Sequence, residues 1–188
     1  MNDTQLFAFE SDFVSTLRCI PMAVRLKLDL CGIKLSLRQW SRFTRSDREV
    51  LLIMPCGSRA EVEAYRAELV DLVTSRAGEA AKPLAEPACR RWEDPYRIPI
   101  VVADYAASLD LSPPSRSQWA ALTRLQRFVL VKLCRDNHDN INFAPAMTEF
   151  GLGASSQGAE RAQRSPVRDL AARRAPRSKA SIAAGVDA

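Results

Sequence analysis

A pattern that occurs twice along the chain constrains the fold more than any other feature. The same residues recur 79 positions later: Ser36, Gln39, Trp40, Thr44 and Arg48 in the first copy, and Ser115, Gln118, Trp119, Thr123 and Arg127 in the second. Ser-x-x-Gln and Thr-x-x-Asp or Gln are capping boxes, in which side chains satisfy the unpaired N–H groups at a helix start. Each copy therefore predicts two successive helix starts, and the repeat predicts two related units.

Helix boundaries can be placed around these starts. Each copy opens with an Ile-Pro pair, at 20–21 and 98–99, and proline is well tolerated in the first turn of a helix. The first copy then predicts a helix that ends at Gly32, because glycine adopts the positive φ of a helix C-terminus. The second start of each copy opens an apolar helix, at 45–54 and 124–134, with apolar residues at corresponding positions in the two copies.

Two further helices complete the predicted set. One runs from a capping box at Ser58 to Gly78, and a short one lies near 145–150. The alternation of 33–35 is too short to indicate a sheet. We therefore expect an all-α fold, a single helical domain over residues 1–152 that is built from two related helical units, at about 20–55 and 98–134.

Proline density predicts a linker between the two units. Residues 78–99 contain four prolines, which excludes a continuous helix there, and we expect Trp92 and Tyr96 to hold this linker against the body. Trp40 and Trp119 are expected as core anchors of the two copies, because their large apolar area favours burial.

Charge distribution argues against a nucleic-acid-binding body. The net charge is +5, but residues 153–188 hold seven basic and three acidic side chains, so the preceding residues carry only +1. This C-terminal tail is rich in Ala, Arg, Ser and Gly and lacks aromatic residues, so we expect it to be disordered. Contact with nucleic acid is then expected only as a non-specific property of the tail.

Cysteine usage and hydropathy bear on location. The five cysteines are odd in number and form no C-x-x-C pair, which favours a reducing compartment over a disulfide framework. The first residues are acidic and lack a long apolar stretch, and the longest apolar run, 50–54, is far too short to cross a bilayer. We expect a cytoplasmic protein without membrane contact.

Residues 134–143 contain the candidates for chemistry. His138 is the only histidine, and Cys134 lies four residues earlier, on the same face if the helix continues. One hypothesis is a small enzyme, or a metal- or ligand-binding site, centred on this pair. The alternative is structural: Cys134 is a small buried apolar residue, and His138 forms hydrogen bonds within a loop. Asn140 and Asn142 belong to the same polar segment, which could equally build turns or contact a partner.

Arg18 and Arg25 are unexpected where they stand. They flank the predicted start of the first helix, where basic groups gain nothing from the helix dipole. Two interpretations remain open: they pair with acids such as Glu10, Asp12 or Asp29, or they hold an acidic partner. No glycine-rich phosphate loop or dinucleotide fingerprint is present, so no cofactor is predicted and no catalytic or metal residue is assigned.

Several runs of residues together resemble the nitrate reductase associated protein family. They are 9–14 (FESDFV), 17–22 (LRCIPM), 27–29 (KLD), 118–128 (QWAALTRLQRF) and 142–150 (NFAPAMTEF). The resemblance covers about residues 7–152 in order. It implies an accessory role in nitrate assimilation but supplies no catalytic residue, and the Ser112-Pro113-Pro114 insertion and the basic tail depart from the family pattern.

The leading hypothesis is a non-catalytic accessory protein that acts by contact with nitrate reductase or another nitrate-assimilation protein. Its weak partner-binding candidates are Arg18, Arg25, His138, Asn140 and Asn142. The alternatives are the Cys134 and His138 site described above and a nucleic-acid-binding regulator. The second alternative requires the body, and not only the tail, to bind DNA with strong salt dependence.

Truncation after Leu152 tests the role assigned to the tail. Because residues 153–188 contribute little apolar area, we expect the truncated protein to fold and to keep nearly the same melting temperature. Thermal unfolding followed by circular dichroism measures this. A large drop in melting temperature would show that the tail docks on the body.

Overall fold

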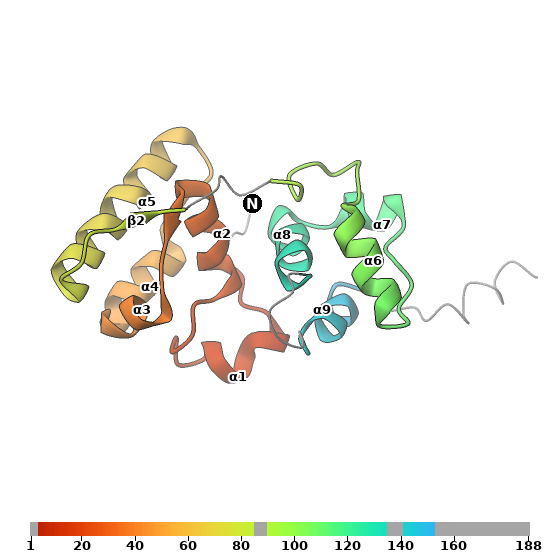
Figure 1. Ribbon diagram of the computed structural model, residues 1–188, viewed down its shortest axis with the longest axis horizontal. Helices are drawn as coiled ribbons and strands as arrows, with labels where there is room; N and C mark the ends of the chain where they lie inside the picture. Colours follow the sequence, from red (N-terminus) through yellow and green to blue (C-terminus); the bar gives the residue numbers. More distant parts are fainter. Residues whose placement is uncertain (1–3, 85–89, 135–140, 153–188) are drawn as a thin grey trace, which may run out of the picture.

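The computed structural model describes residues 4–84, 90–134 and 141–152, and this part of the chain is mostly helical (Figure 1). The helices are α1 Ser11–Val14, α2 Met22–Cys31, α3 Leu37–Arg42, α4 Arg45–Ile53, α5 Arg59–Leu72, α6 Ile100–Ser108, α7 Arg116–Ala121, α8 Arg124–Leu133 and α9 Phe143–Glu149, with short helical turns η1 Ala8–Glu10 and η2 Val73–Ala77. The predicted helical character is confirmed. The disordered tail that we expected at 153–188 lies outside the described residues.

The predicted capping boxes form as expected. At the start of α3, the Gln39 N–H donates to Ser36 Oγ over 3.2 Å, and the Ser36 N–H donates to Gln39 Oε1 over 2.9 Å. The same reciprocal bonds begin α4, α5, α7 and α8. Each box satisfies donors that the helix itself leaves unpaired, which is why these starts could be located in the sequence.

Other helix ends also follow from local chemistry. Gly32 ends α2 with φ 68°, and Gly78 follows η2 with φ 67°, as predicted. The two prolines differ slightly from expectation, because Pro21 and Pro99 are N-cap residues with φ −62° and lie just before the first turn of α2 and α6.

A short sheet corrects the expectation that no strands form. β1, Ile33–Lys34, pairs antiparallel with β2, Lys82–Pro83, in the register Ile33 to Pro83 and Lys34 to Lys82. The Leu84 N–H extends this contact by donating to the Gly32 carbonyl over 3.0 Å. Two-residue strands carry no periodic signal, so the pairing could not be read from residues 33–35 alone.

α2 lies at the centre of the molecule. It packs against α4 and α5 on one side and against α8 on the other, so that α3, α4 and α5 lie apart from α6, α7 and α9 (Figure 1). Eight of its ten residues are buried. Asp29 on this helix forms an ion pair with Lys132 of α8, with 2.7 Å between Oδ2 and Nζ. α2 is thus held by apolar packing from both sides, and on the α8 side by this ion pair as well.

The two repeated tryptophans are fully buried, as predicted, and make similar bonds. Trp40 Nε1 donates to the Leu17 carbonyl over 2.8 Å, and Trp119 Nε1 donates to the Asp94 carbonyl over 3.0 Å. Each indole therefore joins a capped helix to the segment that precedes α2 or α6. Because the indole N–H finds an acceptor, burial of these large rings leaves no unpaired donor in the core.

The two apolar helices predicted at 45–54 and 124–134 form as α4 and α8, but they are not equally buried. In α8, Val129 and Leu133 are buried, because this helix packs against α2, α6 and α9. In α4, Val50 and Ile53 are 39% and 68% exposed. α4 packs against α2 and α5 and offers its other face to solvent.

The expectation for the segment 78–99 is correct for one aromatic residue and wrong for the other. Trp92 is buried and packs edge-on against Phe128, with 5.4 Å between the ring centroids. Tyr96 is 82% exposed and does not hold the segment in place.

Among the described residues, no helix combines the length and the apolar composition that crossing a membrane requires.

Trp119→Ala should destabilise the protein strongly. We expect a loss of about 3 to 5 kcal/mol in the free energy of unfolding, because the change leaves a large cavity and an unpaired Asp94 carbonyl. Trp119→Phe is the control, since it keeps an aromatic ring and loses only the hydrogen bond, and its cost should be smaller. Equilibrium unfolding in urea measures both, and a loss below about 1 kcal/mol for Trp119→Ala would contradict the core assignment.

Candidate functional site: an arginine-bearing turn and a pocket at the start of α6

The turn between α1 and α2 is held in an unusual backbone conformation. Leu17 has φ 52°, in the left-handed region, although it is not glycine. Its side chain is buried, and its carbonyl accepts hydrogen bonds from Trp40 Nε1 and from Arg48 at 3.1 Å. Such a conformation costs on the order of 1–3 kcal/mol, so it persists only where surrounding contacts enforce it.

The predicted arginines lie on and beside this turn. The Arg25 side chain donates through Nε to the Ile20 carbonyl over 3.1 Å, which closes the far side of the turn. Arg18 follows Leu17 directly and is exposed, and within the described ranges its guanidinium has no ion pair or hydrogen bond. The structure thus fixes the backbone on both sides of Arg18 and leaves its charge facing solvent.

Of the acids considered as ion-pair partners, Glu10 alone interacts with one of these arginines in the described residues. Burial raises the pKa of the Glu10 carboxyl, and the positive charge of Arg25 opposes that shift. Glu10 Oε2 accepts the Met22 N–H at the start of α2 over 3.0 Å. Asp29 binds Lys132 instead. The ion-pair interpretation therefore applies to Arg25 as a long-range attraction and not to Arg18.

The first described residues contact the last helix, α9, and the residue that follows it. Glu149 of α9 accepts the N–H groups of Ala8 and Phe9 over 2.9 and 3.1 Å. The rings of Phe7 and Phe150 also meet edge-on, with 5.1 Å between centroids. α9 therefore fixes η1, the helical turn that precedes α1 and the arginine-bearing turn.

The second predicted cluster is only partly within the described residues. His138 and Asn140 lie outside them. Asn142 is half-buried at the N-cap of α9, where its side chain makes no capping bond. The Cys134 thiol donates to the Leu130 carbonyl over 3.0 Å, and burial raises its pKa to about 12.

A metal site in the described part of the chain would need several ligand side chains close together. Among the residues that the structure describes, no three His, Cys, Asp or Glu side chains are grouped closely enough to hold a metal ion. Burial likewise raises the pKa of Cys56 to about 11, with the neighbouring Cys31 adding to the shift. These thiols are protonated near neutral pH and are weak nucleophiles and weak ligands there.

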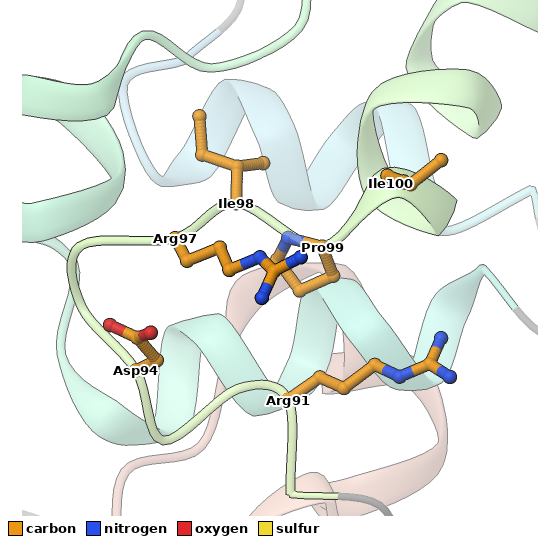
Figure 2. Close-up of a pocket in the computed structure, with 6 residues that line it drawn as sticks. All are labelled: Arg91, Asp94, Arg97, Ile98, Pro99 and Ile100. Atoms are coloured by element: carbon orange, nitrogen blue, oxygen red, sulfur yellow. The ribbon is translucent and has the colours of Figure 1, made fainter.

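A pocket at the start of α6 was not predicted. It encloses about 430 Å³ and is lined by Arg91, Asp94, Arg97, Ile98, Pro99 and Ile100. Figure 2 shows the Arg91 and Arg97 side chains running in the same direction, toward the side of Ile100, with Asp94 at the opposite side. The sequence places this stretch in the proline-rich linker. A usable signal is the run 96–101 (YRIPIV), in which Arg97 stands among apolar residues at the start of an apolar helix.

A model of the family described as conserved nitrate reductase-associated protein matches residues 6–150. The chain belongs to this family. The matched range nearly coincides with the described helices from η1 to α9, and it ends before the basic tail. No curated protein matches the chain. No solved structure matches it either.

Membership of the nitrate reductase-associated family confirms the resemblance seen in the sequence. It supports an accessory role in nitrate metabolism and an association with nitrate reductase. The match assigns no role to any residue. Candidate residues therefore come from the geometry of the turn, the pocket and the buried thiols.

The raised thiol pKa values predict slow modification of the folded protein. At pH 8, a thiol of pKa about 12 is only about 0.01% thiolate, and the thiolate is the reactive form. We expect iodoacetamide to modify Cys134 at least ~100-fold more slowly in the native protein than in the denatured protein, measured by peptide mass spectrometry. Because the denatured chain provides the reference for the same residue, fast native labelling would show a stabilised thiolate and favour the Cys134 and His138 hypothesis.

Proposed function

We propose that this protein is a non-catalytic, cytoplasmic accessory protein of nitrate assimilation that acts by contact with nitrate reductase or another protein of that process. The family match supports the association, and the contact mechanism is our inference from the molecule's surfaces. The contact that we propose uses Arg18, with Arg25 as its structural support.

The single observation that carries this proposal is the way in which Arg18 is presented. The strained Leu17 backbone is fixed by bonds from Trp40 and Arg48, and the Ile20 carbonyl is fixed by Arg25. A rigid backbone lowers the entropy cost of binding, and arginine is over-represented among the residues that dominate protein interfaces. An acidic group on the partner would complement the exposed guanidinium.

Asn142, His138 and Asn140 remain secondary members of the proposed surface. Asn142 is half-buried, and its side-chain amide makes no capping bond to α9. The other two lie outside the described residues and stay predictions from the sequence.

We also propose that the chain consists of two related helical units, 20–55 and 98–134, joined by the proline-rich segment. Support comes from the equivalent bonds in the two copies. Arg48 Nη1 donates to the Leu17 carbonyl and Arg127 Nε to the Trp92 carbonyl, in the segments that precede α2 and α6. The buried indoles of Trp40 and Trp119 bond to the same two segments.

The enzyme alternative is less well supported by the described chemistry. A nucleophile or metal ligand at Cys134 would require a thiolate, whereas burial stabilises the neutral thiol. The nucleic-acid alternative has no specific support, because most of the net positive charge lies in residues 153–188 and the preceding residues are close to neutral.

Charge reversal at Arg18 tests the proposed contact. Arg18→Glu should weaken binding to purified nitrate reductase by at least ~10-fold, as loss of a central interface arginine does, and should slow growth on nitrate but not on ammonium. Arg59→Glu is the matched control, since Arg59 is also exposed but lies at the start of α5. Biolayer interferometry measures the affinity, and circular dichroism must show that all variants are folded.

His138→Ala separates this proposal from the enzyme alternative. Under the contact mechanism, the variant should support nearly normal growth on nitrate, because several residues share the binding energy and none performs catalysis. If His138→Ala abolishes growth while the protein stays folded, the non-catalytic proposal is wrong. Metal analysis of the purified wild-type protein then becomes the next measurement.

A further inference from the structure

α6 has apolar residues on a face that does not pack against the rest of the described protein. Val102 and Ala106 are buried toward α8, but Ile100 and Val101 are 71% and 37% exposed. Tyr96, just before the helix, is 82% exposed. Figure 1 shows α6 far from α3, α4 and α5, on the other side of α2 and α8. Exposed apolar residues that adjoin one another in this way mark an interaction surface more often than isolated ones do.

Charges of opposite sign border these apolar residues. On the side that precedes the helix, Arg91 and Arg97 line the pocket with Ile100 (Figure 2). On the other side, Asp104 is exposed one turn after Ile100, and Asp110 is exposed just beyond the end of α6. The surface is therefore basic at the start of α6, apolar at Ile100 and Val101, and acidic further along.

The remaining acid near the pocket is already engaged. Asp94 lines the same pocket, but its Oδ1 accepts the Tyr96 N–H over 2.8 Å. Arg97, by contrast, has no ion pair or hydrogen bond in the described ranges, and it is exposed. The basic end of the surface thus retains a charge that a ligand could neutralise.

We propose that this surface binds a second copy of the chain, with the two α6 helices antiparallel across a two-fold axis near Ile100 and Val101. In that arrangement the Arg97 end of each copy faces the Asp104 end of the other, and the four central aliphatic side chains meet at the axis. A two-fold interface must be self-complementary, and a surface with opposite charges on its two sides meets that requirement. A uniformly acidic or uniformly basic partner would be repelled at one end.

The dimer is expected to be weak and to depend on concentration. α6 has nine residues and spans only about 14 Å at 1.5 Å per residue, and stable interfaces bury about 800 Å² on each partner. The flanking charges are exposed, so salt should weaken the association. The proposal is independent of the Arg18 contact with nitrate reductase and can be tested on the protein alone.

Sedimentation velocity of the full chain, over a wide range of protein concentration, measures the association. We expect a concentration-dependent shift from the 20.9 kDa monomer to a dimer, with dissociation constants in the micromolar range. Ile100→Asp should abolish the shift, because it places like charges at the axis. Arg59→Asp, which reverses an exposed charge on α5, should leave it unchanged.

Exchanging the charges of Arg97 and Asp104 tests whether the two α6 helices are antiparallel. Arg97→Asp and Asp104→Arg should each weaken dimerisation by at least ~10-fold, since each places like charges opposite one another. The double variant restores opposite charges in an antiparallel pair and should recover wild-type association within about threefold. Melting temperatures close to that of the wild type establish that each variant is folded.

Three results would each overturn the proposal. The first is a monomer at every concentration, the second is a dimer that Ile100→Asp leaves intact, and the third is a double variant that is weaker than either single variant. Any of them would mean that two copies of the chain do not pair through α6 in the proposed geometry.

Discussion

The ammonium group of Lys27 organises the packing around the central helix. Lys27 is 1% exposed, and its Nζ donates to the carbonyls of Leu52 and Met54 at 2.6 and 2.7 Å, where α4 ends. A buried charge is tolerated only where partners replace its hydration, and the last carbonyls of a helix carry partial negative charge. Two residues later, Asp29 binds Lys132 of α8. Neighbouring charges of α2 therefore connect it to α4 and to α8.

Local chemistry explains which parts of this fold were predictable. The Ser36 and Thr123 capping boxes and the Gly32 terminus each depend on a few adjacent residues, so they follow from sequence directly. The exposure of Ile53 and the pairing of β1 with β2 depend on which segments meet in space, and no local pattern encodes that.

The same distinction applies to the candidate site. Arg18 and Arg25 could be singled out because basic residues are unusual at a helix start. The strained Leu17 backbone beside Arg18 is visible only in the structure, because no sequence pattern predicts a positive φ at a leucine. The pocket at Arg97 was overlooked for a different reason. Proline density indicated a linker held against the body by Trp92 and Tyr96, whereas Tyr96 is exposed and the pocket lies at the residues between Trp92 and α6.

The Ala8 and Phe9 N–H groups donate to a carboxylate, that of Glu149, which lies 141 and 140 residues later in the sequence. During synthesis, the first helical turn leaves the ribosome long before its acceptor exists. At translation rates of about 5–20 residues per second, the interval is about 7–28 s. Throughout that time the aromatic rings of Phe7 and Phe9 lack the ring of Phe150. The nascent chain thus carries an aromatic segment without its packing partner until α9 emerges, and transiently exposed apolar surface of this kind promotes aggregation during folding.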